Sequence, residues 1–350
     1  MSIFINIILP VFGLILVGYA AGRTPILPPL AVRGIANAAT YIMIPVLLFR
    51  SMIGDGTVPS MEPVIVVAYF SGCLIVLMLA LISGRLLFRM RLEQLGVFGM
   101  GAMYSNAALL GLPLMQTAFG TSGVILQTKI LAFHSLILLP VTTMLISLGR
   151  GQTGGVFKFI GPAVKDTLTN PIIIGLVSGL VWSFTGLGLW GPLDRMTGML
   201  SAAASPTALI ALGAALAQST LRIGGELLEA MMVAVLKLAV HPLIVWFLTA
   251  RVAGLPPEAV AVATVTAALP AGANVYLQAH QFGVYVTGAV NAVMLTTLLS
   301  VISITLILGL LHPSLGQVGK TGAGPCEMQV VRVMFSFTLL SPPTTYGKDT

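Results

Sequence analysis

Long apolar runs recur along the whole chain, separated by short stretches that hold most of its charged and turn-forming residues. Each run has about 20 residues, which is enough to cross roughly 30 Å of hydrocarbon as an α-helix. We predict ten spans, at residues 2–22, 31–53, 62–88, 94–119, 122–148, 167–185, 197–219, 226–251, 257–282 and 284–311. The pattern therefore indicates an all-α polytopic membrane protein.

The fourth and ninth runs contain residues that interrupt a membrane helix. One stretch is Tyr104-Ser-Asn-Ala-Ala-Leu-Leu-Gly-Leu-Pro113 and the other is Ala268-Leu-Pro-Ala-Gly-Ala-Asn-Val-Tyr276. Proline lacks an N–H group and glycine weakens a helix, so the backbone should be broken in both stretches. In hydrocarbon the freed N–H and C=O groups are tolerated only where protein, water or a ligand satisfies them. Two such breaks are typical of a transport site.

The two halves of the chain repeat. The paired landmarks are Pro10 and Pro171, Pro45 and Pro206, and Phe119-Gly120 and Phe282-Gly283, which lie 161, 161 and 163 residues apart. Each repeat holds five spans, an odd number, so the second copy must enter the membrane from the opposite side. We therefore expect two inverted five-helix repeats, 1–148 and 167–312, with broken helices four and nine crossing near the midplane. A cytoplasmic loop at 149–166 joins them, and 313–350 is predicted to be a disordered or artefactual tail.

Lysine and arginine are unevenly divided between alternate loops. One side holds nine of them and the other holds only Arg195 and Arg251. Because cytoplasmic loops carry the excess of positive charge, the first side should be cytoplasmic and both termini should lie outside. Arg50, near the outer end of the second span, is expected to extend its side chain to the interface. The net charge of +7 thus reflects membrane orientation and does not indicate nucleic-acid binding.

The breaks supply a candidate anion site without a charged side chain. A half-helix starting near Pro113, and another after Gly272, would direct their free N–H groups and positive dipole ends towards the centre. Asn106, Asn274 and Gln278 add amide groups that can orient a carboxylate. The predicted substrate-binding residues are Asn106, Gly111, Pro113, Pro270, Gly272, Asn274, Gln278 and Lys237. The alternative is that the amides only hold helices together.

Lys129 and His134 lie within the fifth predicted span, and Lys237 and His241 lie within the eighth. Lys237 is near the middle of its span, where insertion of a lysine costs about 2.5 to 3.5 kcal/mol, so it should face protein or a water-filled cavity. It could be the counter-charge of an anion or a lock on a broken backbone. His241 lies four residues later on the same helix face and could bond a carbonyl freed by Pro242. The roles of Lys129 and His134 stay open.

The absence of certain residue types reduces the number of possible functions. The predicted span interiors contain no aspartate or glutamate, so the chain lacks the membrane carboxylate that a cation/proton antiporter needs. We find no metal-spaced cluster and no catalytic triad, and therefore expect neither an enzyme nor a bound cofactor. Sodium coupling through backbone and amide oxygens stays open, as does proton coupling.

Five stretches in order resemble the auxin efflux carrier family, whose bacterial members include malonate and other organic-acid permeases. They are residues 8–19, 106–113 followed by Phe119-Gly120, 169–171, 205–213 and 269–274. The resemblance implies ten helices with crossed, broken fourth and ninth helices, an elevator-like transport domain, and an anionic carboxylate substrate at Asn106, Pro113 and Pro270. A long hydrophilic central loop, as in plant members, is absent, which favours a permease of a bacterial inner membrane over an auxin carrier.

We therefore expect a secondary transporter of a small mono- or dicarboxylate anion, working by alternating access in the lipid bilayer. A sodium-coupled symporter of the bile-acid type is the nearest alternative, and a passive channel or a membrane-embedded enzyme would belong to other classes. A homodimer is an expectation from the fold alone.

Overall fold

The computed structural model describes residues 4–53, 63–151, 169–218 and 226–317, without the side chains of residues 4 and 312–317. Within this part of the chain, seven helices are long and apolar enough to cross a membrane. They are Ile5–Gly22, Pro29–Ile53, Pro63–Leu87, Ala107–Gly149, Gly191–Gln218, Glu226–Val252 and Val286–Leu311. The shorter apolar helices Pro171–Phe184 and Pro257–Ala268 lie between them. The protein is thus an all-helical, multi-pass membrane protein, as the apolar runs predict.

Several of these spans are divided into α-helical and wider π-helical segments. In chain order they are η1 (Phe4–Ile8), α1 (Leu9–Gly22), α2 (Pro29–Ala38), η2 (Ala39–Met43), α3 (Ile44–Ile53), α4 (Pro63–Leu87), α5 (Leu92–Met103), η3 (Ala107–Gly111), α6 (Leu112–Gly149), α8 (Pro171–Phe184), α9 (Gly191–Gln218), α10 (Glu226–Val235), η4 (Leu236–Val240), α11 (His241–Phe247), η5 (Leu248–Val252), α12 (Pro257–Ala268), α13 (Asn274–Phe282) and α14 (Val286–Gln317). Gly120, with φ 65°, divides α6 where the sequence predicts the end of the fourth span.

Proline explains the position of four of the five π-helical segments. The segments η1, η2, η3 and η4 each end two residues before a proline, namely Pro10, Pro45, Pro113 and Pro242. A proline ring clashes with the carbonyl four residues earlier and cannot donate to it, and a wider turn relieves that clash. The carbonyl of Leu238, four residues before Pro242, accepts instead from Ser303 Oγ of α14 at 2.7 Å. His241, which the sequence allowed as a partner for a freed carbonyl, is therefore not needed at this one.

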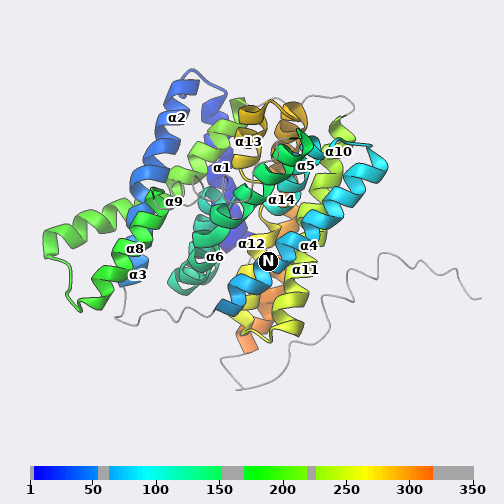
Figure 1. Ribbon diagram of the computed structural model, residues 1–350. Coiled ribbons are helices and arrows are strands. Elements are labelled where there is room, and N and C mark those ends of the chain that lie inside the picture. Colours follow the sequence, from blue (N-terminus) through cyan, green and yellow to red (C-terminus); the bar gives the residue numbers. More distant parts are fainter. Residues whose placement is uncertain (1–3, 54–62, 152–168, 219–225, 318–350) are drawn as a thin grey trace, which may run out of the picture.

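One group of helices packs through glycine. Helix α1 packs against α9, and α3 packs against α8 and α9. A Cβ added to Gly18 would come within 2.1 Å of Ile210 O, and one added to Gly213 within 1.9 Å of Ile15 O. Such close backbone approach between membrane helices requires small residues. Figure 1 shows α2, α3, α8 and α9 together on the left of the molecule. We call α1, α2, α3, α8 and α9, with η1 and η2, the first helix group.

The other helices form a second group, which comprises α4, α5, α6 and α10–α14 with η3, η4 and η5. In Figure 1 α4, α10 and α11 lie on the right, and α6 and α12 lie between them and the first group. A core of buried side chains runs through α4, α5, α6, α10 and α14, with Tyr69 and Phe98 among its fully buried members. A second core joins α1, α3 and α9 to η3, α12 and α14. The two groups are therefore packed against each other along the broken helices.

At two span ends the structure differs from the sequence prediction. Arg50 does not simply extend to the interface, because its Nη1 forms an ion pair with Asp194 Oδ1 at 2.6 Å and also donates to Thr197 Oγ1. Helix α14 continues to Gln317, past the boundary predicted at residue 312. Most of the predicted loop at 149–166 and of the predicted tail lies outside the described residues, and both stay predictions.

Candidate functional site

The two predicted helix breaks are present, and they lie against each other. Helix α5 ends at Met103 and η3 begins at Ala107, while α12 ends at Ala268 and α13 begins at Asn274. Between these ends, residues 105 and 271 form an isolated antiparallel bridge. The N–H of residue 106 donates to the Pro270 carbonyl at 2.8 Å, and the N–H of residue 272 donates to the carbonyl of residue 104 at 3.0 Å. The breaks thus satisfy part of each other's backbone.

The residues of the breaks account for this close approach. Gly272 is necessary because a Cβ there would lie 2.9 Å from a ring carbon of Tyr104 and 3.1 Å from the Ser105 carbonyl. The Ala271 N–H donates to Thr296 Oγ1 of α14 at 3.1 Å, so a neighbouring helix satisfies a further freed group. The prediction that the first half-helix starts near Pro113 is wrong, since the helical backbone resumes at Ala107. The wide turn η3 carries the chain into α6 before the proline is reached.

A cavity of about 630 Å³ opens beside the crossing, on the side where η3 and α13 begin. Its polar lining comes from five places in the sequence, namely Asn37, Thr40 and Tyr41; Tyr104, Ser105 and Asn106; His134 and Ser135; Thr169 and Asn170; and Gly272 and Asn274. Among the described residues no Asp, Glu, Lys or Arg lines it. The cavity is therefore polar but carries no formal charge of its own.

Three helices begin at this cavity. They are the helix that starts as η3 after Asn106, α13 at Asn274 and α8 after Asn170, and each of these asparagines is a lining residue. The first N–H groups of a helix have no partner within the helix, and they carry a partial positive charge. The Asn170 side chain satisfies one of them itself, accepting from the Ile172 N–H at 2.9 Å. The N–H groups of Ala107 and Val275 are also bonded, to the carbonyls of Ser105 and Gly272 at 2.8 and 3.0 Å. The other first N–H groups place partial positive charge at the cavity without any cationic side chain among its described lining residues.

The polar side chains of the lining are held in different ways. Tyr104 Oη lies 2.8 Å from Ser135 Oγ and accepts from Asn274 Nδ2 at 2.6 Å, which ties α13 to the first break. His134 Nε2 accepts from the Ser105 N–H at 3.2 Å, so a neutral imidazole carries its proton on Nδ1, which has no partner among the described residues. Asn106 also has no side-chain hydrogen bond within the described part of the chain, and its amide is available to a ligand.

Of the eight predicted site residues, the structure places Asn106, Gly272 and Asn274 on the cavity and the other five elsewhere. Gly111 and Pro113 are buried, and a Cβ on Gly111 would lie 2.7 Å from Gln127 Nε2. Pro270 contributes only its carbonyl, which is bonded within the crossing. Gln278 is also buried and donates to Thr143 Oγ1 at 2.6 Å, which is the helix-holding role that the sequence left as the alternative.

Lys237 is fully buried and lies behind the crossing, away from the cavity lining. Its Nζ donates to Ser105 Oγ at 2.6 Å and to the Ala267 carbonyl at 2.8 Å, and it lies 3.1 Å from His241 Nδ1. Of the two roles left open by the sequence, this geometry favours the lock on the broken backbone. Lys129 is half-buried on α6 and does not line the cavity.

The sequence analysis missed the lining residues from the first helix group. Asn37, Thr40 and Tyr41 are three and four residues apart, so they share a helix face, and they lie in an otherwise apolar span. That spacing was a usable signal for a polar face. Gln127 was also missed: it is fully buried, donates to the Ala107 carbonyl at 3.2 Å and accepts from Thr266 Oγ1, so it joins the two breaks.

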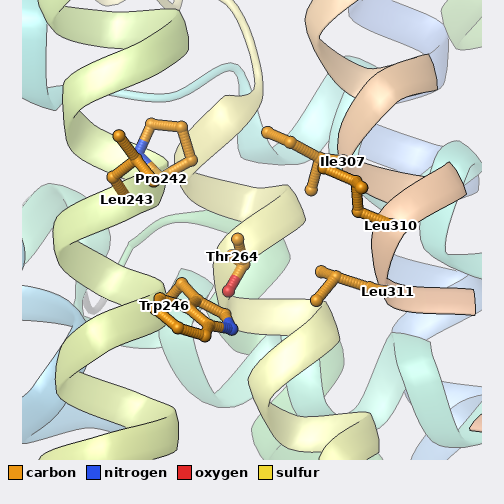
Figure 2. A pocket seen from close by; sticks show the side chains of 7 residues that line it. All are labelled: Pro242, Leu243, Trp246, Thr264, Ile307, Leu310 and Leu311. Atoms are coloured by element: carbon orange, nitrogen blue, oxygen red, sulfur yellow. The ribbon is translucent and has the colours of Figure 1, made fainter. Parts of the chain in front are cut away.

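A second, much smaller cavity lies between α11, α12 and α14 (Figure 2). Its volume is about 20 Å³, and its lining is Pro242, Leu243, Trp246, Thr264, Ile307, Leu310 and Leu311. Trp246 Nε1 and Thr264 Oγ1 have no hydrogen-bond partner among the described residues. A volume of this size has room for about one water molecule, so this cavity is not a substrate site.

A multi-pass chain whose apolar helices are interrupted twice beside a polar cavity belongs to the class of membrane transporters. The family model described as Membrane transport protein matches residues 3–155 and 156–308. The chain belongs to this family, which is the auxin efflux carrier family indicated by the sequence motifs, and the resemblance is confirmed. The family consists of transporters and not of enzymes.

The chain is also similar over nearly all of its length to a curated protein. That relative is a protein of Rhizobium meliloti (strain 1021) named "Putative malonate transporter". The two are 26% identical over 325 residues, which cover 92% of this chain and 98% of the relative.

Proposed function

We propose that this protein is a secondary transporter of a small organic carboxylate anion. The observation that carries the proposal is the convergence of three helix N-termini on one polar cavity, whose described lining contains no acidic residue. Helix N-termini attract anions, and bare N–H groups match carboxylate oxygens. The free amide of Asn106 adds a donor at the same place. The volume of about 630 Å³ lies within the range of small-molecule sites and leaves a small acid room for water.

We propose the ten-span topology for the chain, with two inverted five-helix repeats and broken helices that cross near the midplane. The hydrogen-bonded bridge between residues 105 and 271 supports the crossing, because it joins the two breaks directly. In the predicted orientation α8 follows a cytoplasmic loop, so the cavity at its N-terminus opens towards the cytoplasm. The membrane is then a bacterial inner membrane, with both termini outside. A homodimer stays a prediction.

Transport would proceed by movement of the second helix group against the first. The division of the cavity lining supports this, since Asn37, Thr40 and Asn170 come from the first group while Asn106 and Asn274 come from the second. A sliding movement of the second group would separate the two sets of lining residues and carry the crossing towards the other side of the membrane. This is the elevator form of alternating access.

Malonate is the first substrate to test, because the relative from Rhizobium meliloti carries that name. Purified protein in liposomes preloaded with unlabelled malonate, lactate or pyruvate is given the labelled acid outside. Transient accumulation of label against its gradient is expected for a carrier, and it would distinguish the protein from a channel, which gives no counterflow. Absence of both binding and counterflow for every acid, with and without sodium, would refute the proposal.

A further inference from the structure

On the side of the crossing that faces the cavity, helices begin, and we call this side the first pole. On the opposite side helices end, and we call it the second pole. Helix α5 ends at Met103 and α12 ends at Ala268, so their last carbonyl groups point away from the helices without intrahelical partners. These ends carry a partial negative charge and favour a cation. The oxygens gathered there include the carbonyls of Thr266 and Ala267 and the hydroxyl of Ser105. In many secondary transporters such a pole coordinates the coupling ion.

Here an ammonium group occupies the second pole. The three contacts of Lys237 Nζ, to Ser105 Oγ, the Ala267 carbonyl and His241 Nδ1, have lengths of 2.6, 2.8 and 3.1 Å. A protonated lysine has three N–H donors and no acceptor, so three acceptors saturate it. Among the described residues no Asp or Glu is paired with it. The charge is therefore balanced by the helix ends and by neutral oxygens and nitrogens.

The hydrogen bonds around Ser105 fit a charged lysine without leaving a donor unused. The Ser105 hydroxyl donates to the Thr266 carbonyl at 2.8 Å, so its oxygen is free to accept from Lys237. Tyr69 Oη lies 3.2 Å from the same oxygen and is the second donor that it can accept. Both lone pairs and the proton of this hydroxyl are then in use.

His241 fits the same assignment. Its Nε2 lies 3.5 Å from Cys73 Sγ, and that thiol donates in turn to the Met103 carbonyl at 3.9 Å. The Nε2 proton then points to sulfur, which leaves the Nδ1 lone pair for Lys237. A chain of contacts therefore connects the Met103 carbonyl at the end of α5, through Cys73 and His241, to the Lys237 ammonium. Each member is fully buried or nearly so.

We propose that the Lys237 ammonium is a tethered cation at the second pole, so that this protein binds its substrate anion without sodium. The inference rests on the proposed function for the identity of the anion. Ser105 connects the two poles, since it lines the cavity and accepts from Lys237. The ammonium thus lies one hydroxyl group behind the anion site, where its field favours an anion without direct contact. This argues against the sodium-coupled alternative for this chain.

The experiment compares wild type, Lys237→Met and Lys129→Met in sodium chloride and in choline chloride at equal ionic strength. Melting temperature and malonate binding are measured for each. Wild type and Lys129→Met are expected to give the same values in both salts. Lys237→Met should melt about 5 °C or more below wild type in choline and should recover in a saturable manner on addition of sodium or methylammonium. The ions would then fill the place of the missing ammonium.

The proposal would be overturned if wild type bound malonate only in sodium, or if Lys237→Met were as stable as wild type in choline. A Lys237→Met protein that no small cation stabilises would overturn it as well. If that variant does not accumulate, Lys237→Arg, which keeps the charge, takes its place, and stabilisation of Lys237→Arg by sodium would contradict the proposal. The measurements of melting temperature need no substrate. Failure of wild type to bind any carboxylate would therefore refute the proposed function separately.

Discussion

The sharpest test of the proposed anion site is the substitution Asn106→Ala, because it should weaken binding and leave stability nearly unchanged. The side chain lines the cavity and has no hydrogen bond within the described residues, whereas the backbone of the same residue donates to the Pro270 carbonyl. Alanine keeps the backbone bonds and loses only the amide. The fold should therefore be retained, with a change in melting temperature of less than about 2 °C.

Malonate binding by Asn106→Ala should weaken by the free energy of one hydrogen bond to a charged group. Such a bond contributes about 1.5 to 3 kcal/mol, which corresponds to a rise in Kd of about 10- to 150-fold. The cavity has room for water, and a water molecule can replace part of the lost bond, so a value near 10-fold is expected. Titration calorimetry with malonate on purified protein measures Kd directly, and counterflow in liposomes measures its consequence for transport.

Gln278→Ala is the matched control, because it removes an amide of the same broken-helix pair that does not line the cavity. Its side chain is buried and donates to Thr143 Oγ1 at 2.6 Å. The variant should melt at a lower temperature and bind malonate with unchanged Kd. The reasoning fails if Asn106→Ala binds as wild type does, or if both variants raise Kd equally.

Three further predictions concern stability, each measured by thermal unfolding of the purified protein. Gly213→Ala should destabilise by about 2 kcal/mol or more, since its Cβ would lie 1.9 Å from the carbonyl of Ile15, whereas Gly34→Ala, with open space around its Cβ, should be neutral or slightly stabilising. Ser303→Ala removes the donor to the Leu238 carbonyl of η4, which Pro242 leaves without a helical partner, and should lower the free energy of unfolding by about 1 to 3 kcal/mol. An unchanged melting temperature would contradict this. Asp194→Asn breaks a partly exposed ion pair and should cost less than about 1 kcal/mol, so a large loss would show that the pair is energetically buried.

The helix breaks could be predicted from sequence because their cause is local. Proline and glycine weaken or interrupt a helix in most surroundings, and both stretches contain them together with an asparagine. The exact point of interruption was less predictable. In the first break the chain leaves the helix before Asn106 and re-enters it at Ala107, with the wide turn η3 placed between the break and Pro113. Pro113 therefore follows the break by several residues and lies in the first turn of α6.

Which polar groups line the cavity could not be predicted, because that depends on the neighbouring helices. Asn274 and Gln278 are four residues apart on α13, yet the first lines the cavity and the second bonds to α6. Nothing in the local pattern distinguishes them. Asn37 and Asn170 come from distant parts of the chain and meet the crossing only through the packing of the first helix group. A sequence reading restricted to the breaks therefore finds only part of the lining.

In the proposed function, an anion is bound in a cavity whose described lining contains no cationic side chain. An arginine or lysine on the lining would hold an anion strongly in both orientations and would slow its release. Helix N-termini and amides would hold it more weakly, and Lys237 lies behind Ser105, where its Nζ has three contacts of its own. Because η3, η4, α5, α12 and α13 all belong to the second helix group, both poles would move together in the proposed transport step. The N-terminus of α8 belongs to the first group, so the proposed step would leave one of the three helix N-termini at the cavity behind.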